Sequence, residues 1–220
     1  MEKNQTPNNE IEIRSIVSDL RVEERSDEKS GRVISGYAAK FDTWSEPIYG
    51  WFKEKIARGA FDKTDMSDVI MVFNHDISGI LARSTSGTLT LSVDETGLRF
   101  EFEAPDTTLG NDMVELVRRG DISKCSFKFV VESDEWVYAD DKNKMELDER
   151  TVKSIAKLYD VSLVTYPAYK DTEASVREHL EQRKREALAP TKVDTSSRDR
   201  EVAVLSLRSK LYPSIHTSYV

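Results

Sequence analysis

The stretch LTLSVDETGLRFEF, residues 89–102, decides the fold class of this chain. Apolar and polar residues alternate on both sides of the segment Asp94–Gly97, with Leu89, Leu91 and Val93 before it and Leu98, Phe100 and Phe102 after it. Alternation with a period of two places one face of each strand in a core, and Asp and Gly are common turn residues. The stretch therefore predicts a β-hairpin with one buried face.

Further strands and a few helices are expected before and after this hairpin along the chain. The predicted strands cover residues 11–17, 31–41, 69–73, 125–131 and 157–165, and the predicted helices cover residues 51–61, 109–119 and 172–187. Gly36 is expected at a bulge or a close backbone approach, and Gly120 at the left-handed end of the middle helix. Because short strands dominate, we expect an α+β fold with a mainly antiparallel sheet or barrel.

The length of 220 residues suits one domain with tails. Residues 1–10 carry no hydrophobic pattern, and residues 188–220 are rich in Ser, Thr, Arg and Asp, so both segments are predicted to be disordered. Residues 11–187 would form the folded domain. The segment from residue 177 to residue 210 holds nine basic and six acidic residues, whereas the rest of the chain carries −11. This contrast indicates a tail with a separate task.

The composition excludes several classes of protein. Hydrophobic residues make up 38% of the chain, with no run long enough to span a bilayer and no signal peptide, so we expect a cytosolic protein without membrane contact. A net charge of −8 argues against general binding to nucleic acid. Cys125 is the single cysteine, which excludes an intrachain disulfide.

Three residues are candidates for a nucleophilic site. His75 follows the apolar run of residues 69–73, where a strand end can hold an imidazole rigidly. Ser126 and Lys128 share one strand face, and Cys125 shares the other with Phe127 and Phe129. Since the aromatic face belongs in a core, Ser126 is expected to point outward, and its hydroxyl needs a base such as His75 to become a nucleophile. Asp160, on a later strand, could orient that histidine.

Other kinds of chemistry have less support. Cys125 could act with His75, but its predicted burial favours a small core residue instead. The chain has no H-E-x-x-H or C-x-x-C motif, its three histidines (His75, His179 and His216) are scattered, and no Gly-rich phosphate loop occurs. Neither a metal nor another cofactor is therefore expected.

The order of several short motifs resembles the prohead maturation proteases of tailed bacteriophages over roughly residues 31–175. The stretches that carry the resemblance are ISGYA at 34–38 with Phe41, ARGAF at 57–61, NHD at 74–76, DETGL at 94–98, Gly120 before Ser126-Phe127, and DVSLVTYPAY at 160–169. This family is related to herpesvirus assembly proteases, whose fold is a β-barrel ringed by helices. The resemblance implies the same architecture here.

The resemblance also implies roles for the candidate residues. His75 would be the general base, Ser126 the nucleophile of a serine endopeptidase, and Asp160 the orienting acid. Because related viral proteases use a second histidine as the third member, His179 and Asp171 are further candidates for that place. The chain departs from the family pattern at Lys128 and Ser123, where glycines are usual. The charge of Lys128 could serve the substrate or the oxyanion.

The partners implied by the resemblance are the major capsid protein with its scaffold segment, and the protease itself through autoproteolysis. Cleavage would take place inside the assembling prohead, in the host cytoplasm. A homodimer is a further partner that the resemblance allows, with the charged helix at 172–187 as one contact. The competing interpretation is an inactive scaffold or assembly factor that keeps the protease fold.

Overall fold

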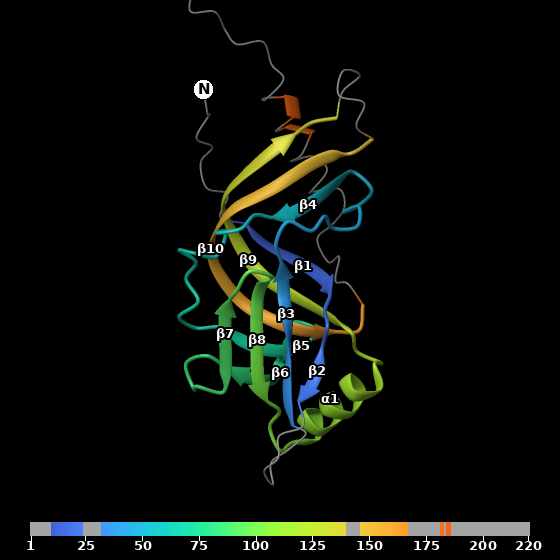
Figure 1. The fold of residues 1–220 in the computed structure, drawn as a ribbon, viewed down its shortest axis with the longest axis vertical. Helices are drawn as coiled ribbons and strands as arrows, with labels where there is room; N and C mark the ends of the chain where they lie inside the picture. Colours follow the sequence, from blue (N-terminus) through green and yellow to red (C-terminus); the bar gives the residue numbers. More distant parts are fainter. Residues whose placement is uncertain (1–9, 24–31, 140–145, 167–180, 183, 186–220) are drawn as a thin grey trace, which may run out of the picture. The chain divides into compact units, whose positions relative to one another are not determined.

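The computed structural model describes residues 10–23, 32–139, 146–166, 181–182 and 184–185 (Figure 1). Residues 1–173 and residues 174–220 form two units, and all the strands and the helix described below belong to the first. Within the described part of the chain, no helix combines the length and the apolar character needed to cross a bilayer.

Two open β-sheets make up the first unit. One sheet has the order β1 (Ile11–Val17), β9 (Lys124–Val137), β10 (Asp148–Val164), β5 (Ile70–Phe73), β6 (Asp76–Arg83), and β4 (Phe52–Ile56) also pairs with β10. The other has the order β2 (Arg21–Glu23), β3 (Val33–Lys40), β8 (Gly97–Glu103), β7 (Leu89–Val93). β10 pairs in parallel with β4 and β5, and the other neighbours are antiparallel.

The described residues are mostly β-strand with one helix, which fits the expected mainly antiparallel α+β class only loosely. The expected closed barrel is wrong. In the described residues the first sheet ends at β1 and β6, which do not pair with each other, and the second ends at β2 and β7. The ring of helices is also absent there, because α1 (Thr108–Arg119) is the single helix of the described part of the first unit.

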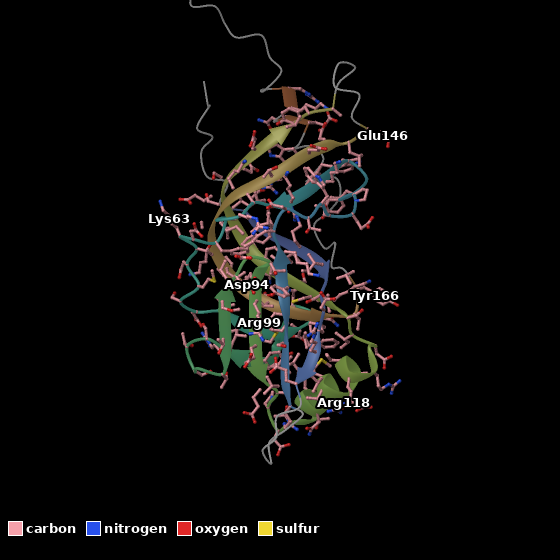
Figure 2. The ribbon with its side chains drawn as sticks, viewed as in Figure 1. Lys63, Asp94, Arg99, Arg118, Glu146 and Tyr166 are labelled. Carbon is pink, nitrogen blue, oxygen red and sulfur yellow. The ribbon has the colours of Figure 1, made fainter. Side chains whose placement is uncertain are left out.

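The hairpin at residues 89–102 forms as predicted, from β7 and β8. Its buried face pairs Leu89 with Phe102 and carries Phe100, which has no exposed surface. Asp94 closes the turn, since its Oδ1 accepts hydrogen bonds from the backbone of Thr96 at 2.7 Å and of Gly97 at 3.0 Å. Figure 2 labels Asp94 in this turn and Arg99 on β8.

The predicted helix at 109–119 is α1, and both of its ends follow from local chemistry. The side chain of Thr107 accepts a hydrogen bond from the backbone of Gly110 at 3.1 Å and caps the first turn. Gly120 ends the helix with a φ of 80°, a left-handed conformation that glycine adopts without strain. Met113, Val114 and Val117 form the buried face.

The predicted helix at 51–61 is wrong, because this segment begins with the strand β4. Phe52 and Ile56 are four residues apart, which suits one face of a helix but equally one face of a strand. In β4 every second residue is buried, including Glu54, and the strand pairs with β10. The pairing with β10 therefore decided between the two periods. Gly59 follows in a turn, with a φ of 83°.

The remaining predicted strands are present, with β9 and β10 much longer than expected. Gly36 lies at a close approach, as predicted, since an added Cβ would stand 2.7 Å from Leu20 Cδ2 and 3.0 Å from Ser18 Oγ. A shift in register follows between Tyr37 and Ala39. The predicted disordered ends at 1–10 and 188–220 and the charged helix at 172–187 lie almost entirely outside the described residues, so these predictions stand untested.

Candidate active site

The central strands β9 and β10 place four polar side chains on one face of the first sheet. Ser126 is the cross-strand partner of Ser162, and Lys128 is the partner of Asp160. Side chains two residues apart on a strand share a face, so all four project to the same side. The opposite face carries Cys125 and apolar residues of the core.

His75 reaches this face from the neighbouring hairpin of β5 and β6. Phe73 pairs with Asp76, which leaves Asn74 and His75 as a two-residue turn, with φ values of 51° and 58°. Left-handed φ values at both positions are typical of type I′ hairpin turns, where glycine is favoured and a histidine is strained. The turn is held by the backbone of Asn74, which donates to the carbonyl of Leu163 at 2.9 Å.

The structure brings together the three residues singled out in the sequence. Nε2 of His75 lies 2.7 Å from Oγ of Ser126, and Nδ1 lies 2.7 Å from Oδ1 of Asp160. Both distances are within the range of strong hydrogen bonds. The imidazole thus connects a hydroxyl to a carboxylate, and all three side chains are buried, with 5% exposure for His75 and 3% for Asp160.

Ser162 is a member of the cluster that the sequence analysis missed. Its hydroxyl lies 3.0 Å from Nδ1 of His75 and 3.1 Å from Oδ1 of Asp160, and it accepts a hydrogen bond from the His75 backbone at 3.2 Å. The available signal was its position two residues after Asp160 on a predicted strand, which places both side chains on one face. Ser162 helps to position both the ring and the turn that carries it.

Lys128 contacts the carboxylate from the other side. Its Nζ lies 3.3 Å from Oδ2 of Asp160, and its side chain is 25% exposed. The two alternatives considered from sequence were contacts with a substrate or with an oxyanion. The structure adds a third contact, an ion pair with Asp160, and the two alternatives stay predictions.

Cys125 lies on the core side of β9, as strand alternation predicts. It has no exposed surface, and burial raises the pKa of its thiol well above the usual range. A thiol that resists ionisation is a poor nucleophile. Ser126 shares its face with Lys128 as expected, but the expectation that it points outward into solvent is wrong, since its exposed fraction is 0%.

β1 is one reason for the burial of Ser126. β1 pairs antiparallel with β9 along its whole length, and Ser15 is the partner of Ser126. The Ser126 hydroxyl also lies 2.9 Å from the carbonyl oxygen of Arg14, to which it can donate a hydrogen bond. The nucleophile candidate is therefore in contact with the main chain of an extended segment. Figure 1 shows β1 (blue) running beside β9.

The Arg14 side chain is part of a cluster of five charged residues. Arg14 donates to Glu54 Oε1 at 2.8 Å, and Arg150 donates to Glu54 at 2.8 Å, to Asp134 at 2.8 Å and to Glu12 at 2.6 Å. Burial alone would raise the pKa of Glu12, but the charges of Arg150 and Arg14 outweigh it and lower that pKa to about 2. Glu54 is only 3% exposed, so a buried carboxylate stands beside the Arg14 guanidinium.

The other candidate residues give no alternative site in the described residues. Asp171 and His179, the further candidates for the third catalytic position, lie outside them. No group of three or more His, Cys, Asp or Glu side chains among the described residues is arranged to hold a metal ion.

A hydroxyl, an imidazole and a carboxylate joined in one row are the arrangement found in serine hydrolases, whatever their fold. The model of one protein family, caudovirus prohead serine protease, matches residues 19–186. The chain therefore belongs to this family of phage prohead proteases. No curated protein and no solved structure matches the chain. The matched stretch contains the three candidate residues but begins after β1.

Proposed function

We propose that this chain is a serine endopeptidase in which His75 is the general base, Ser126 the nucleophile and Asp160 the orienting acid. The observation that carries the proposal is the continuous row of contacts from Ser126 Oγ through the imidazole to Asp160 Oδ1, with both distances at 2.7 Å. Nε2 is within reach of the hydroxyl proton, which is the geometric requirement for a general base.

The reaction follows from this arrangement. His75 takes the proton of Ser126 as Oγ attacks a peptide carbonyl carbon, and Asp160 stabilises the imidazolium that forms. The proton then passes to the leaving amine, and water releases the acyl group from Ser126. Ser162 restrains the ring so that its two nitrogens keep these partners.

The family supports a role in the maturation of phage proheads. The substrates would be the scaffold segment of the major capsid protein and the protease itself, cleaved within the assembling prohead. Residues 188–220, as a polar tail, would direct packaging into the shell or be removed by self-cleavage. No cofactor enters this mechanism.

The decisive experiment is the reaction of the full chain with a fluorophosphonate probe, which labels an activated serine. We expect labelling of Ser126 in the unmodified protein and none in Ser126→Ala or His75→Ala. In infected cells, Ser126→Ala should give proheads that retain uncleaved scaffold. Normal processing by Ser126→Ala would refute the proposal.

A second candidate is an assembly factor that keeps the fold without turnover. The specific observation in its favour is that Ser126 has no exposed surface and contacts the carbonyl of Arg14. Such a protein would bind capsid protein but leave Ser126 unlabelled under every condition, including after changes that loosen β1.

A further inference from the structure

We infer that the edge of β9 beside Ser126 is the binding site for an extended substrate strand, that β1 occupies this site in cis, and that Glu54 selects a basic residue at the position of Arg14. The inference rests on the proposed function. It adds where a peptide would lie, which side chain is recognised, and what keeps the site covered.

The first observation is the position of β1 relative to Ser126. The carbonyl oxygen of Arg14 lies 2.9 Å from Ser126 Oγ, so its carbonyl carbon, one bond of about 1.23 Å further, is within about 4 Å of Oγ. In the sheet, β9 has β10 on one side and β1 on the other. Without β1, that side of β9 would be a sheet edge, and extended peptides commonly bind by adding a strand to such an edge.

The second observation is that β1 is held differently from the other strands of its sheet. Among the described residues, no hydrophobic side chain of β1 belongs to the hydrophobic core or packs against it. Ile11 and Val17, at its two ends, are 50% and 69% exposed. Backbone pairing and the ion pairs of Glu12 and Arg14 therefore hold the strand. Another extended peptide with a basic side chain can form the same two kinds of contact.

A third observation concerns the fit of β1. Oγ of Ser15 is buried without a hydrogen-bond partner among the described residues, on the face that it shares with Ser126. A buried hydroxyl without a partner is unfavourable, because it has given up its hydrogen bonds to water. β1 is therefore an imperfect occupant. It also lies outside the stretch that matches the protease family, which begins at residue 19.

The charges around Arg14 identify the preferred side chain. If β1 leaves, Glu12 and Arg14 leave with it, and Glu54 loses the Arg14 guanidinium while it keeps that of Arg150. A buried carboxylate that loses one of its two cationic partners favours an incoming arginine or lysine. The ring of Phe129, 6.0 Å from the Arg14 guanidinium, adds a cation–π contact that favours arginine.

The contact with Arg14 also explains how β1 would restrain the nucleophile. Ser126 has one hydroxyl proton and two neighbouring acceptors, Nε2 of His75 and the carbonyl of Arg14. Attack requires this proton to move to His75, so a hydroxyl that donates to the carbonyl is held in a resting state. The strand is tethered through Ser18, whose hydroxyl donates to the carbonyl of Tyr37 at 2.8 Å, and a tethered strand competes at high effective concentration.

The sequence of β1 supplies a probe for this site. Residues 12–15 read Glu-Ile-Arg-Ser, and the same spacing recurs as Glu-Glu-Arg-Ser at residues 23–26. Peptides of residues 10–18 and 21–28, each with a fluorophore and a quencher, should be cleaved after Arg14 and after Arg25, respectively. A peptide of residues 10–18 with Gln in place of the arginine is the matched control.

The first test uses Arg14→Glu in the full chain, which sets two carboxylates against each other and should release β1. We expect Ser126 to react with the fluorophosphonate at least about tenfold faster than in the unmodified chain. Arg14→Gln should give a smaller increase and serves as a milder variant should the charge reversal impair folding. Arg118→Glu reverses an exposed charge on α1 (Figure 2) and should leave the rate unchanged.

The second test measures specificity in the Arg14→Glu background. The arginine peptide should be cleaved with a kcat/KM at least about tenfold above that of the glutamine peptide, mainly through KM. Adding Glu54→Gln should remove this preference while cleavage of the glutamine peptide persists, which also shows that the double variant folds.

Two kinds of failure can be told apart. Unchanged or slower labelling in both Arg14 variants, or equal cleavage of the two peptides, overturns the assignment of β1 and Glu54 while leaving the serine protease intact. Absence of labelling and of cleavage in every variant overturns the proposed function itself.

Discussion

Lys128 and His75 bind opposite oxygens of one carboxylate: Nζ of Lys128 lies 3.3 Å from Oδ2 of Asp160, and Nδ1 of His75 lies 2.7 Å from Oδ1. Asp160 is 3% exposed, so its negative charge depends on these partners and on Ser162 rather than on water. Lys128, one of the two positions that depart from the expected family pattern, is thereby an ion-pair partner of this cluster.

Lys128→Met should lower the free energy of unfolding by about 1–3 kcal/mol, because it leaves a buried carboxylate oxygen without its cation. Urea denaturation measures this change. Lys40→Met is the matched control, since Lys40 pairs with Asp19, which is 71% exposed, and such surface pairs contribute about 0–1 kcal/mol. Equal effects of the two substitutions would show that the Lys128 contact contributes no more than a surface pair.

Asp160→Asn should reduce the reactivity of Ser126 by about 10⁴, because the amide no longer stabilises the imidazolium or the required tautomer. Ser162→Ala removes one hydrogen bond to the ring and should reduce it only about tenfold. The rate of fluorophosphonate labelling, measured beside the unfolding free energy of each variant, separates chemistry from folding. A larger loss for Ser162→Ala than for Asp160→Asn would contradict the assigned roles.

Cys125 should be inert in the folded protein. Burial raises the pKa of its thiol, so at pH 8 the thiolate is scarce, and the side chain has no exposed surface. We expect no reaction with iodoacetamide in buffer and complete reaction in concentrated urea, measured by intact mass. Cys125→Ala should retain labelling of Ser126. If Cys125→Ala abolished the activity without unfolding the protein, the cysteine would have to be reconsidered as the nucleophile.

The docking of β1 should weaken in acid. The pKa of Glu12 is lowered from 4.5 to about 2 when β1 is in place, because the charges of Arg150 and Arg14 outweigh the opposing effect of burial. A depressed pKa contributes stability above pH 4.5 that is lost as the pH falls toward 2, by up to about 3 kcal/mol. Hydrogen-exchange protection of the β1 amides, corrected for intrinsic rates, should fall over this window.

Glu12→Gln is the control for this effect. It cannot titrate, so the protection of β1 should be lower at pH 6 than in the unmodified chain and should lose most of its dependence on pH between 4.5 and 2. A steep fall that persists in Glu12→Gln would assign the acid sensitivity to another group.

The local part of the site could be read from the sequence because strand alternation is a property of neighbouring residues. It placed Ser126 and Lys128 on one face of β9 and Cys125 on the other, as the structure has them. It failed for residues 51–61, where Phe52 and Ile56 satisfy both a helical and a strand period. Only the partner strand β10 distinguishes the two, and no local pattern contains that information.

The burial of Ser126 was equally beyond the sequence. One face of β9 was expected to be exposed to solvent because Ser126 and Lys128 are polar, but a polar face can be covered by another strand. β1 is more than 100 residues away along the chain, and its backbone supplies the contact.

The amino-acid sequence by itself determined which side chains share a face, where the hairpin at residues 89–102 and the helix α1 form, and which residue types carry the chemistry. The tertiary structure decided that His75, at a strained turn after β5, meets Ser126 on β9 and Asp160 on β10, and that the backbone of β1 contacts Ser126. The physical reason is that periodicity acts between neighbours, whereas these contacts depend on the register of strands β1, β9, β10 and β5, which only the folded chain aligns.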